Sequence, residues 1–219
     1  MNTQPVIGLL GGTFDPPHNA HLAMANAFLH LFGNAQVVFL PAGDPYHKKP
    51  TQTASRHRLN MCLAAVGDNP HFAVSDVDMR DGATYTYDTV RIFREIYPNA
   101  QLWWIMGEDS LRYVHQWHKG KELLSLANFA VARRGDDGDF AEITQHIIEQ
   151  GKQAAENNLP TGQMRFLAMS KNEISSTKIR QALADNALGL PENIAQQIPT
   201  AVLDYIRQNG LYQLAVSSE

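Results

Sequence analysis

The sequence predicts an α/β protein with a doubly wound, mostly parallel sheet of about five to six strands and a helical extension at the C-terminus. Short apolar runs alternate with stretches of helical spacing along most of the 219 residues, the pattern of a parallel sheet with crossover helices. Several runs are apolar at nearly every position, as in strands covered on both faces. We expect one domain over 1–219, with a core over about 4–184 and C-terminal helices over about 185–214.

Six apolar runs are predicted to be strands. They are Val6–Leu10, Gln36–Leu40, Phe72–Val77, Gln101–Met106, Phe129–Ala132 and the shorter Arg165–Met169. Parallel strands bring the loops at their carboxyl ends to one edge of the sheet, where ligands bind in this class of fold. The loops in question begin at Gly11, Pro41, Gly107 and Arg133.

Between these runs, apolar residues recur at spacings of three and four, which predicts helices. The predicted helices are His21–Phe32, Ser55–Val66, Thr86–Tyr97, Asp109–Val114, Lys121–Leu126, Phe140–Ala155, Ser175–Ala184 and Thr200–Asn209. We expect Ser55 to cap its helix and Gly210 to end the last one, since these residue types favour those positions.

Composition excludes several classes of protein. The formal net charge is −4, from 18 Lys and Arg against 22 Asp and Glu, which argues against a nucleic-acid binder. The single cysteine, Cys62, excludes a disulfide framework and is expected to be a small buried apolar residue. No apolar run reaches the roughly 18 residues of a membrane span, and the N-terminus lacks the pattern of a signal peptide. We therefore expect a cytoplasmic protein.

The first motif that suggests chemistry runs from Gly11 to His21, where a strand leads through two glycines and a turn into a helix. Glycines let backbone amides approach a phosphate, and the start of a helix attracts anions. His18 and His21 are three residues apart, so both rings can donate to phosphate oxygens that gain charge. A zinc pair and a capped helix with two surface histidines are the alternatives. The motif is neither a Walker A loop nor a dinucleotide fingerprint.

The second motif places Ser175, Ser176 and Thr177 at the start of a helix, with Arg180 four residues after Ser176. Hydroxyls, unpaired backbone amides and a guanidinium together form an anion clamp. The alternative is an ordinary serine cap followed by a surface arginine.

Together the two motifs resemble the nucleotidylyltransferase superfamily with its T/H-x-G-H signature, and more narrowly the bacterial nicotinate-nucleotide adenylyltransferases. Further segments agree with this resemblance: PAGDPYHKK at 41–49, TYTYDT at 84–89, IMGEDSL at 105–111, Trp117, Arg133-Arg134 and YIRQNGLY at 205–212. The resemblance spans residues 6–212 and implies a Rossmann-like nucleotidylyltransferase fold. One position departs from the signature, because Ala20 stands where the family usually has glycine before the second histidine.

The resemblance also implies roles for individual residues. His18, His21 and Arg180 would be catalytic, holding the ATP phosphates. ATP would also contact Gly11, Gly12, Thr13, Phe14, Lys48, Gly107, Asp109, Ser175, Ser176 and Thr177. Thr86 and Trp117 would bind nicotinate mononucleotide, Trp117 by stacking on the pyridinium ring, a flat cation that indole attracts. A solvated Lys48 and a half-buried, purely structural Trp117 are the alternatives at those positions.

The activity implied is adenylyl transfer from ATP to nicotinate mononucleotide, giving nicotinate adenine dinucleotide and pyrophosphate in NAD biosynthesis. Mg²⁺ would be carried by the ATP phosphates, with no metal bound by the protein itself. A phosphopantetheine adenylyltransferase, a non-catalytic nucleotide-binding module and a similar fold with an unrelated ligand are the alternatives. The sequence leaves open the oligomeric state, a homo-oligomer included, and the choice between acid and amide mononucleotides.

Overall fold

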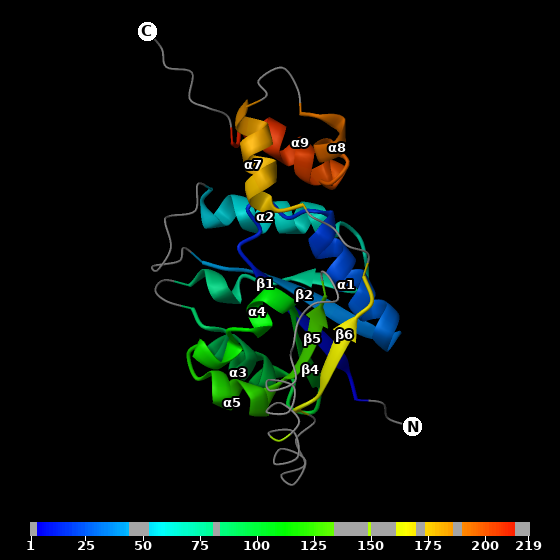
Figure 1. The fold of residues 1–219 in the computed structure, drawn as a ribbon, viewed down its shortest axis with the longest axis vertical. Coiled ribbons are helices and arrows are strands. Elements are labelled where there is room, and N and C mark those ends of the chain that lie inside the picture. Colours follow the sequence, from blue (N-terminus) through cyan, green and yellow to red (C-terminus); the bar gives the residue numbers. More distant parts are fainter. Residues whose placement is uncertain are drawn as a thin grey trace.

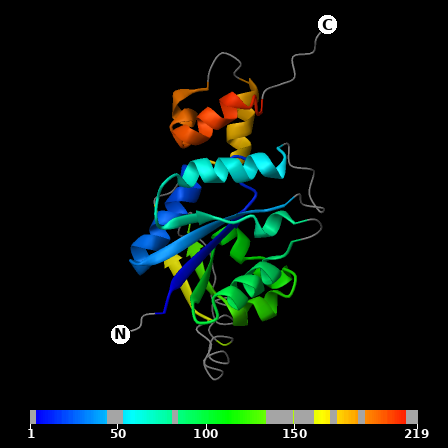
Figure 2. The ribbon, with the colours of Figure 1, turned by 180° about the vertical axis from the view of Figure 1, so that it is seen from behind.

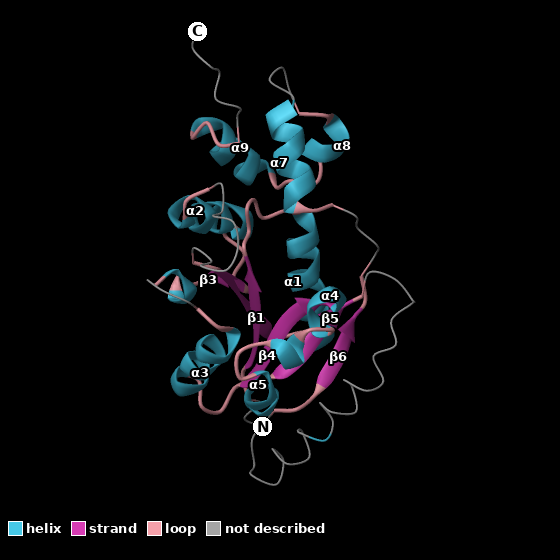
Figure 3. Ribbon diagram, turned by 60° about the vertical axis from the view of Figure 1, so that its left-hand side comes forward, coloured by secondary structure: helices cyan, strands magenta, loops and turns pink. Residues whose placement is uncertain are grey.

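The computed structural model describes residues 4–43, 53–80, 84–133, 149, 161–169, 174–185 and 190–212. Six parallel strands form one sheet in the order β3-β2-β1-β4-β5-β6. Figure 3 shows the strands of this sheet in magenta. The strands are β1 (Val6–Gly12), β2 (Ala35–Pro41), β3 (Phe72–Val74), β4 (Gln101–Gly107), β5 (Asn128–Ala132) and β6 (Met164–Leu167). This confirms the predicted doubly wound sheet. The chain order reverses between β1 and β4, the point where such folds open a ligand crevice.

Helices cover both faces of the sheet (Figure 1). The longer ones are α1 (Asn19–Phe32), α2 (Ser55–Val66), α3 (Thr86–Ile96) and α5 (Gly120–Leu126). The apolar sequence of β4 is explained by the burial of both of its faces. Trp104 and Met106 pack in the cluster that contains residues of α3 and α5, whereas Trp103 and Ile105 pack in the cluster that contains residues of α1 and α2. Successive side chains of a strand point to opposite faces, and here both faces are buried.

The short elements around the carboxyl edge are η1 (Val77–Met79), α4 (Glu108–Leu111) and η2 (Val114–Gln116). The C-terminal helices are α7 (Ser176–Asp185), α8 (Glu192–Ala195) and α9 (Thr200–Gln208). They gather beyond α2, on the side away from the sheet (Figure 2), around buried Ile179, Val202 and Ile206 together with Met61 of α2. None of the helices in the described ranges has the length and apolar character needed to span a membrane.

Several boundaries differ from the predicted ones. β3 ends at Val74 instead of Val77, because the Ser75 amide makes the last bond to the Phe39 carbonyl and the Ser75 hydroxyl then accepts the amide of Val77. Local hydroxyl-to-backbone bonds of this kind compete with the sheet. The prediction that Ser55 caps α2 was wrong, since the capping position is Ala54.

The remaining differences are small. α1 begins at Asn19, two residues before the predicted start. The predicted helix Asp109–Val114 is divided into α4 and η2. Cys62 is buried, as expected. The helix predicted at Phe140–Ala155 lies outside the described residues, apart from residue 149.

Candidate active site

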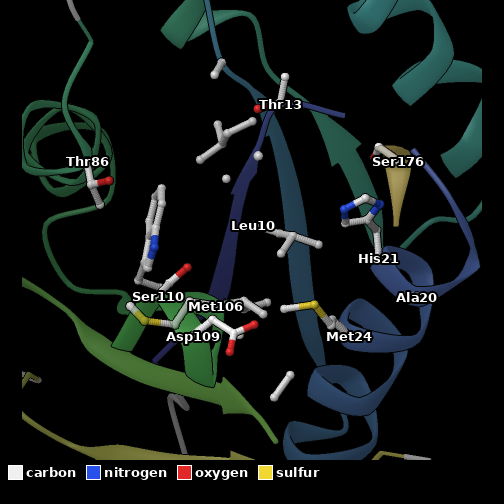
Figure 4. Close-up of a pocket in the computed structure, with 18 of the residues that line it drawn as sticks. Leu10, Thr13, Ala20, His21, Met24, Thr86, Met106, Asp109, Ser110 and Ser176 are labelled. Atoms are coloured by element: carbon white, nitrogen blue, oxygen red, sulfur yellow. The ribbon is translucent and has the colours of Figure 1, made fainter. Parts of the chain in front are cut away.

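A cavity of about 570 Å³ opens at the carboxyl edge of β1 and β4. Most of the residues predicted to form the site line it: Gly11, Gly12, Thr13, His18, His21, Thr86, Gly107, Asp109, Trp117, Ser175 and Ser176. Phe14, Thr177 and Arg180 are not among its lining residues, and Lys48 lies outside the described residues. Figure 4 shows His21 and Ser176 together on one side of the cavity, with Thr86 on the opposite side and Asp109 between. The fold thus brings together segments from both ends of the chain.

The two histidines form one unit at the start of α1. The His18 amide donates to Nδ1 of His21 at 3.1 Å, and the ring centroids lie 3.8 Å apart in a stacked arrangement. The Phe14 and His21 rings pack edge to face with their centroids 4.9 Å apart, and Phe14 is only 1% exposed. Phe14 therefore supports His21 from the core. The same packing holds the Phe14 backbone at φ 51°. For a residue other than glycine, this conformation needs support from its surroundings.

Aromatic side chains pack closely against both glycines of the turn. A Cβ on Gly11 would lie 2.6 Å from two indole carbons of Trp104, closer than van der Waals contact allows. A Cβ on Gly12 would lie 3.1 Å from the Phe14 ring. Ala20, the departure from the family signature, lines the cavity and packs against the apolar cluster of the C-terminal helices. Its methyl group is therefore partly accommodated in that apolar packing.

The second motif contacts the turn of the first. The Ser176 hydroxyl donates to the Pro16 carbonyl at 2.9 Å, across 160 sequence positions. Arg180 donates to the Asp15 carbonyl at 2.6 Å and to the Thr177 hydroxyl at 3.3 Å. Ser175 accepts the amide of Lys178 at 3.3 Å, the usual bond of a helix cap. The motif thus both caps α7 and fixes the backbone before His18.

At the other end of the cavity, two aromatic segments meet. Trp117 follows η2, is half-buried and packs against the core cluster of α3 and α5. The next residue, His118, stacks on Tyr85 with centroids 4.2 Å apart. Lys119 Nζ lies 4.7 Å from the centroid of the Tyr87 ring. These contacts hold the segment that carries Trp117 against the segment that carries Thr86.

Asp78 is a cavity residue that the sequence did not reveal. It is 7% exposed, and its carboxylate accepts a hydrogen bond from the Thr89 hydroxyl. Burial raises the pKa of the Asp78 carboxyl; the Thr89 bond and nearby Arg80 oppose this effect, and Asp88 adds to it. Asp78 lies just after a predicted strand, and no local pattern marked it.

Arg58 was also missed, since arginine on a helix is normally a surface residue. It is fully buried and donates to four backbone carbonyls, those of Thr13, Ala42, Gly43 and Thr53. The guanidinium thereby ties the loop after β1 to the loop after β2. Arg133 was noted in the sequence as the start of a loop and as part of the family resemblance, without a role in the site. It lines the cavity, and its guanidinium carbon lies 5.2 Å from the centroid of the Phe166 ring.

Known proteins are similar to this chain over most of its length. The family profile described as cytidylyltransferase-like matches residues 9–182. A protein of Neisseria meningitidis serogroup C (strain FAM18), described as a probable nicotinate-nucleotide adenylyltransferase, is 45% identical over 210 residues, covering 94% of this chain and 98% of the relative. A Synechococcus protein (strain JA-2-3B'a(2-13)) with the same description is 39% identical over 208 residues, covering 94% of this chain and 96% of its own.

Among solved structures, the nicotinic acid mononucleotide adenylyltransferase of Plasmodium falciparum, complexed with NaAD, superposes with a TM-score of 0.75. It is 21% identical, and the match covers 95% of this chain and 98% of that one. At this identity the likeness establishes the fold. The close relatives and the family profile establish more: the chain belongs to the cytidylyltransferase-like family and, within it, to the nicotinate-nucleotide adenylyltransferases.

Proposed function

We propose that the protein transfers the adenylyl group of ATP to nicotinate mononucleotide, giving nicotinate adenine dinucleotide and pyrophosphate. The observation that carries this proposal is the layout of the cavity. His21, stacked with His18, lies at one end together with Ser176, and Thr86 lies at the other (Figure 4). Trp117 also lines the cavity, and the residue after it, His118, stacks on Tyr85, the residue before Thr86. The names of the relatives, and the NaAD bound in the Plasmodium falciparum enzyme, support the same activity.

In the reaction, a phosphate oxygen of the mononucleotide attacks the α-phosphorus of ATP. A new P–O bond forms as the bond from the α-phosphorus to the α,β-bridging oxygen breaks, and pyrophosphate leaves with that electron pair. The attacking oxygen is already anionic, so the enzyme needs no general base. Catalysis then consists of positioning and of stabilising charge on the phosphates.

His21 is suited to this stabilisation. Its Nδ1 accepts the His18 amide, so a neutral His21 ring carries its proton on Nε2 and presents a donor. We assign that donor to an oxygen of the α-phosphate. Ser175, Ser176 and Arg180 would bind the leaving pyrophosphate, and the Asp109 carboxylate would accept hydrogen bonds from ribose hydroxyls.

Magnesium carried by the ATP phosphates fits these residues. The described residues contain no group of three or more His, Cys, Asp or Glu side chains arranged to bind a metal. The phosphate end of the cavity instead offers imidazole and hydroxyl donors, which bind phosphate oxygens directly. When bound, the ion would neutralise phosphate charge during the transfer.

The test is to incubate the protein with ATP and Mg²⁺ and measure pyrophosphate release with three acceptors: nicotinate mononucleotide, its amide analogue and phosphopantetheine. We expect the highest kcat/KM with nicotinate mononucleotide. Preference for phosphopantetheine would indicate the sister enzyme instead. ATP binding without pyrophosphate release with any acceptor would indicate a non-catalytic nucleotide-binding module.

A further inference from the structure

The end of the described chain bonds directly to the turn between β1 and α1, which we propose binds phosphate. The Tyr212 hydroxyl donates to Oδ1 of Asp15 at 2.6 Å, across 197 sequence positions. The Asp15 residue is 3% exposed, so this hydrogen bond is shielded from water. Burial and the neighbouring Asp15 raise the pKa of Tyr212 well above its usual value, which keeps the hydroxyl protonated as a donor.

Other contacts from the C-terminal helices hold the same turn. Asn19, the first residue of α1, donates its backbone amide to the Gln197 carbonyl at 2.9 Å and its side-chain amide to the Gln196 carbonyl at 2.8 Å. Ser176 and Arg180 bind the carbonyls of Pro16 and Asp15. His18 lies between Asp15 and Asn19, so this hydrogen-bonded frame fixes the backbone that orients the histidine pair.

The C-terminal helices are attached to α2 by contacts that do not involve the turn. The Tyr205 hydroxyl bonds to His57 at 2.9 Å and accepts from Asn60 at 3.0 Å. Val202 and Ile206 pack with Met61 in the same buried cluster. Loss of the Tyr212 hydroxyl therefore leaves these contacts in place. It removes the bond to Asp15 of the turn and a longer contact, 3.7 Å, with the sulfur of Met61.

We propose that Tyr212 is a positioning residue for adenylyl transfer. Acting through the Asp15 carboxylate, it holds the turn in the shape that sets His18 and His21 against the reacting phosphate. This inference rests on the proposed function. When the hydroxyl is removed, the shielded Asp15 carboxylate loses its donor, and the turn relaxes to recover one. Small displacements of catalytic groups cost large factors in rate.

The experiment compares Tyr212→Phe with Tyr205→Phe, a matched control that removes a hydroxyl from the same group of helices without touching the turn. We expect Tyr212→Phe to lower kcat about 5–50-fold, the range for a lost hydrogen bond to a charged group with loss of alignment. The KM for nicotinate mononucleotide should stay within about twofold, because Trp117 and Thr86 lie at the other end of the cavity. Tyr205→Phe should keep the parental kcat, although its Tm should change by about as much as that of Tyr212→Phe.

A double-mutant cycle tests the contact from its other side. Asp15→Asn keeps an oxygen that accepts the Tyr212 hydroxyl and should retain most of the turnover. Asp15→Ala should lose about as much as Tyr212→Phe, and the double variant should lose no more than either single variant. The Asp15 variants still decide the proposal if Tyr212→Phe is not recovered folded.

A parental kcat in Tyr212→Phe, an equal loss in Tyr205→Phe, or additive losses in the cycle would each overturn the proposal. Failure of the proposed function is a separate result, since the parental protein itself would then release no pyrophosphate with nicotinate mononucleotide. In that case the same cycle would be measured with whichever acceptor the parental protein uses.

Discussion

The amide of His18 and the ring of His21 are joined by a 3.1 Å hydrogen bond to Nδ1, and the two imidazoles stack at 3.8 Å. His21 is thus held by its own helix start and also supported by the edge of Phe14. The bond selects the neutral tautomer with its proton on Nε2, the nitrogen that we assign to the α-phosphate. The position of this donor is set before any substrate binds, as charge stabilisation in a transition state requires.

Replacing His21 tests this role. His21→Ala should lower kcat by about 10²–10³, the range for one lost transition-state donor, while ATP affinity changes far less. His21→Gln should lose similar turnover, although glutamine at this position can keep the capping bond to the His18 amide. His30→Ala, on an exposed face of the same helix, is the control and should keep the parental rate. Activity of His21→Ala within about threefold of the parent would refute the assignment.

Trp117 is expected to act on the other substrate. Stacking on a desolvated cation contributes about 1–2 kcal/mol, so Trp117→Ala should raise the KM for nicotinate mononucleotide roughly 5–30-fold and leave the KM for ATP nearly unchanged. Quenching of tryptophan fluorescence by the mononucleotide should disappear. Tyr113→Ala is the control and should leave both KM values unchanged. Tyr113 lies just before η2, as Trp117 lies just after it, and is 57% exposed. A lower Tm with an unchanged KM would show that Trp117 only packs against the core.

Arg180 is expected to bind two groups at once. One guanidinium nitrogen donates to the Asp15 carbonyl, and the planar fork has further N–H groups for the leaving pyrophosphate. Lysine cannot reproduce this geometry. Arg180→Lys should therefore fold normally but lose at least about tenfold in kcat/KM for ATP, and its effect should be non-additive with that of His21→Ala. Full activity of Arg180→Lys would show that Arg180 does not bind the pyrophosphate and only joins α7 to the turn. Arg207→Lys is the control and should keep the parental activity, since Arg207 is exposed and pairs with Asp204 on the surface of the same group of helices.

Asp78 predicts a pH dependence of stability. Burial raises the pKa of this carboxyl, so the folded state favours the protonated form. Its contribution to stability is therefore fully present below the unfolded pKa of about 4 and is lost as the pH rises through the higher folded pKa. Asp78→Asn should match the parent in Tm near pH 4 and exceed it at neutral pH. A variant that is less stable at every pH would contradict this. Asp204→Asn is the control: Asp204 is exposed, so its replacement should not produce this difference in Tm between pH 4 and neutral pH.

Local sequence was a good guide where one short segment determines the structure. The apolar run Gln101–Met106 could only be a strand buried on both faces, and it is one. The stretch from Gly11 to His21 contains, within itself, the strand, the turn and the helix start that place two imidazoles together. Boundaries were less certain where side chains compete with the backbone, as at Ser75, whose hydroxyl ends β3 early.

The sequence by itself determined the alternation of strands and helices, the two motifs that we propose bind phosphate and the resemblance to the family, because each depends on residues close together in the chain. Only the tertiary structure decided the roles of Arg58, Asp78 and Tyr212. Their side chains are polar, and polarity alone predicts exposure to water. Arg58 and Asp78 are buried and Tyr212 is half-buried. Their partners Thr13, Thr89 and Asp15 lie 45, 11 and 197 positions away, and such contacts form only when the sheet and its helices are assembled.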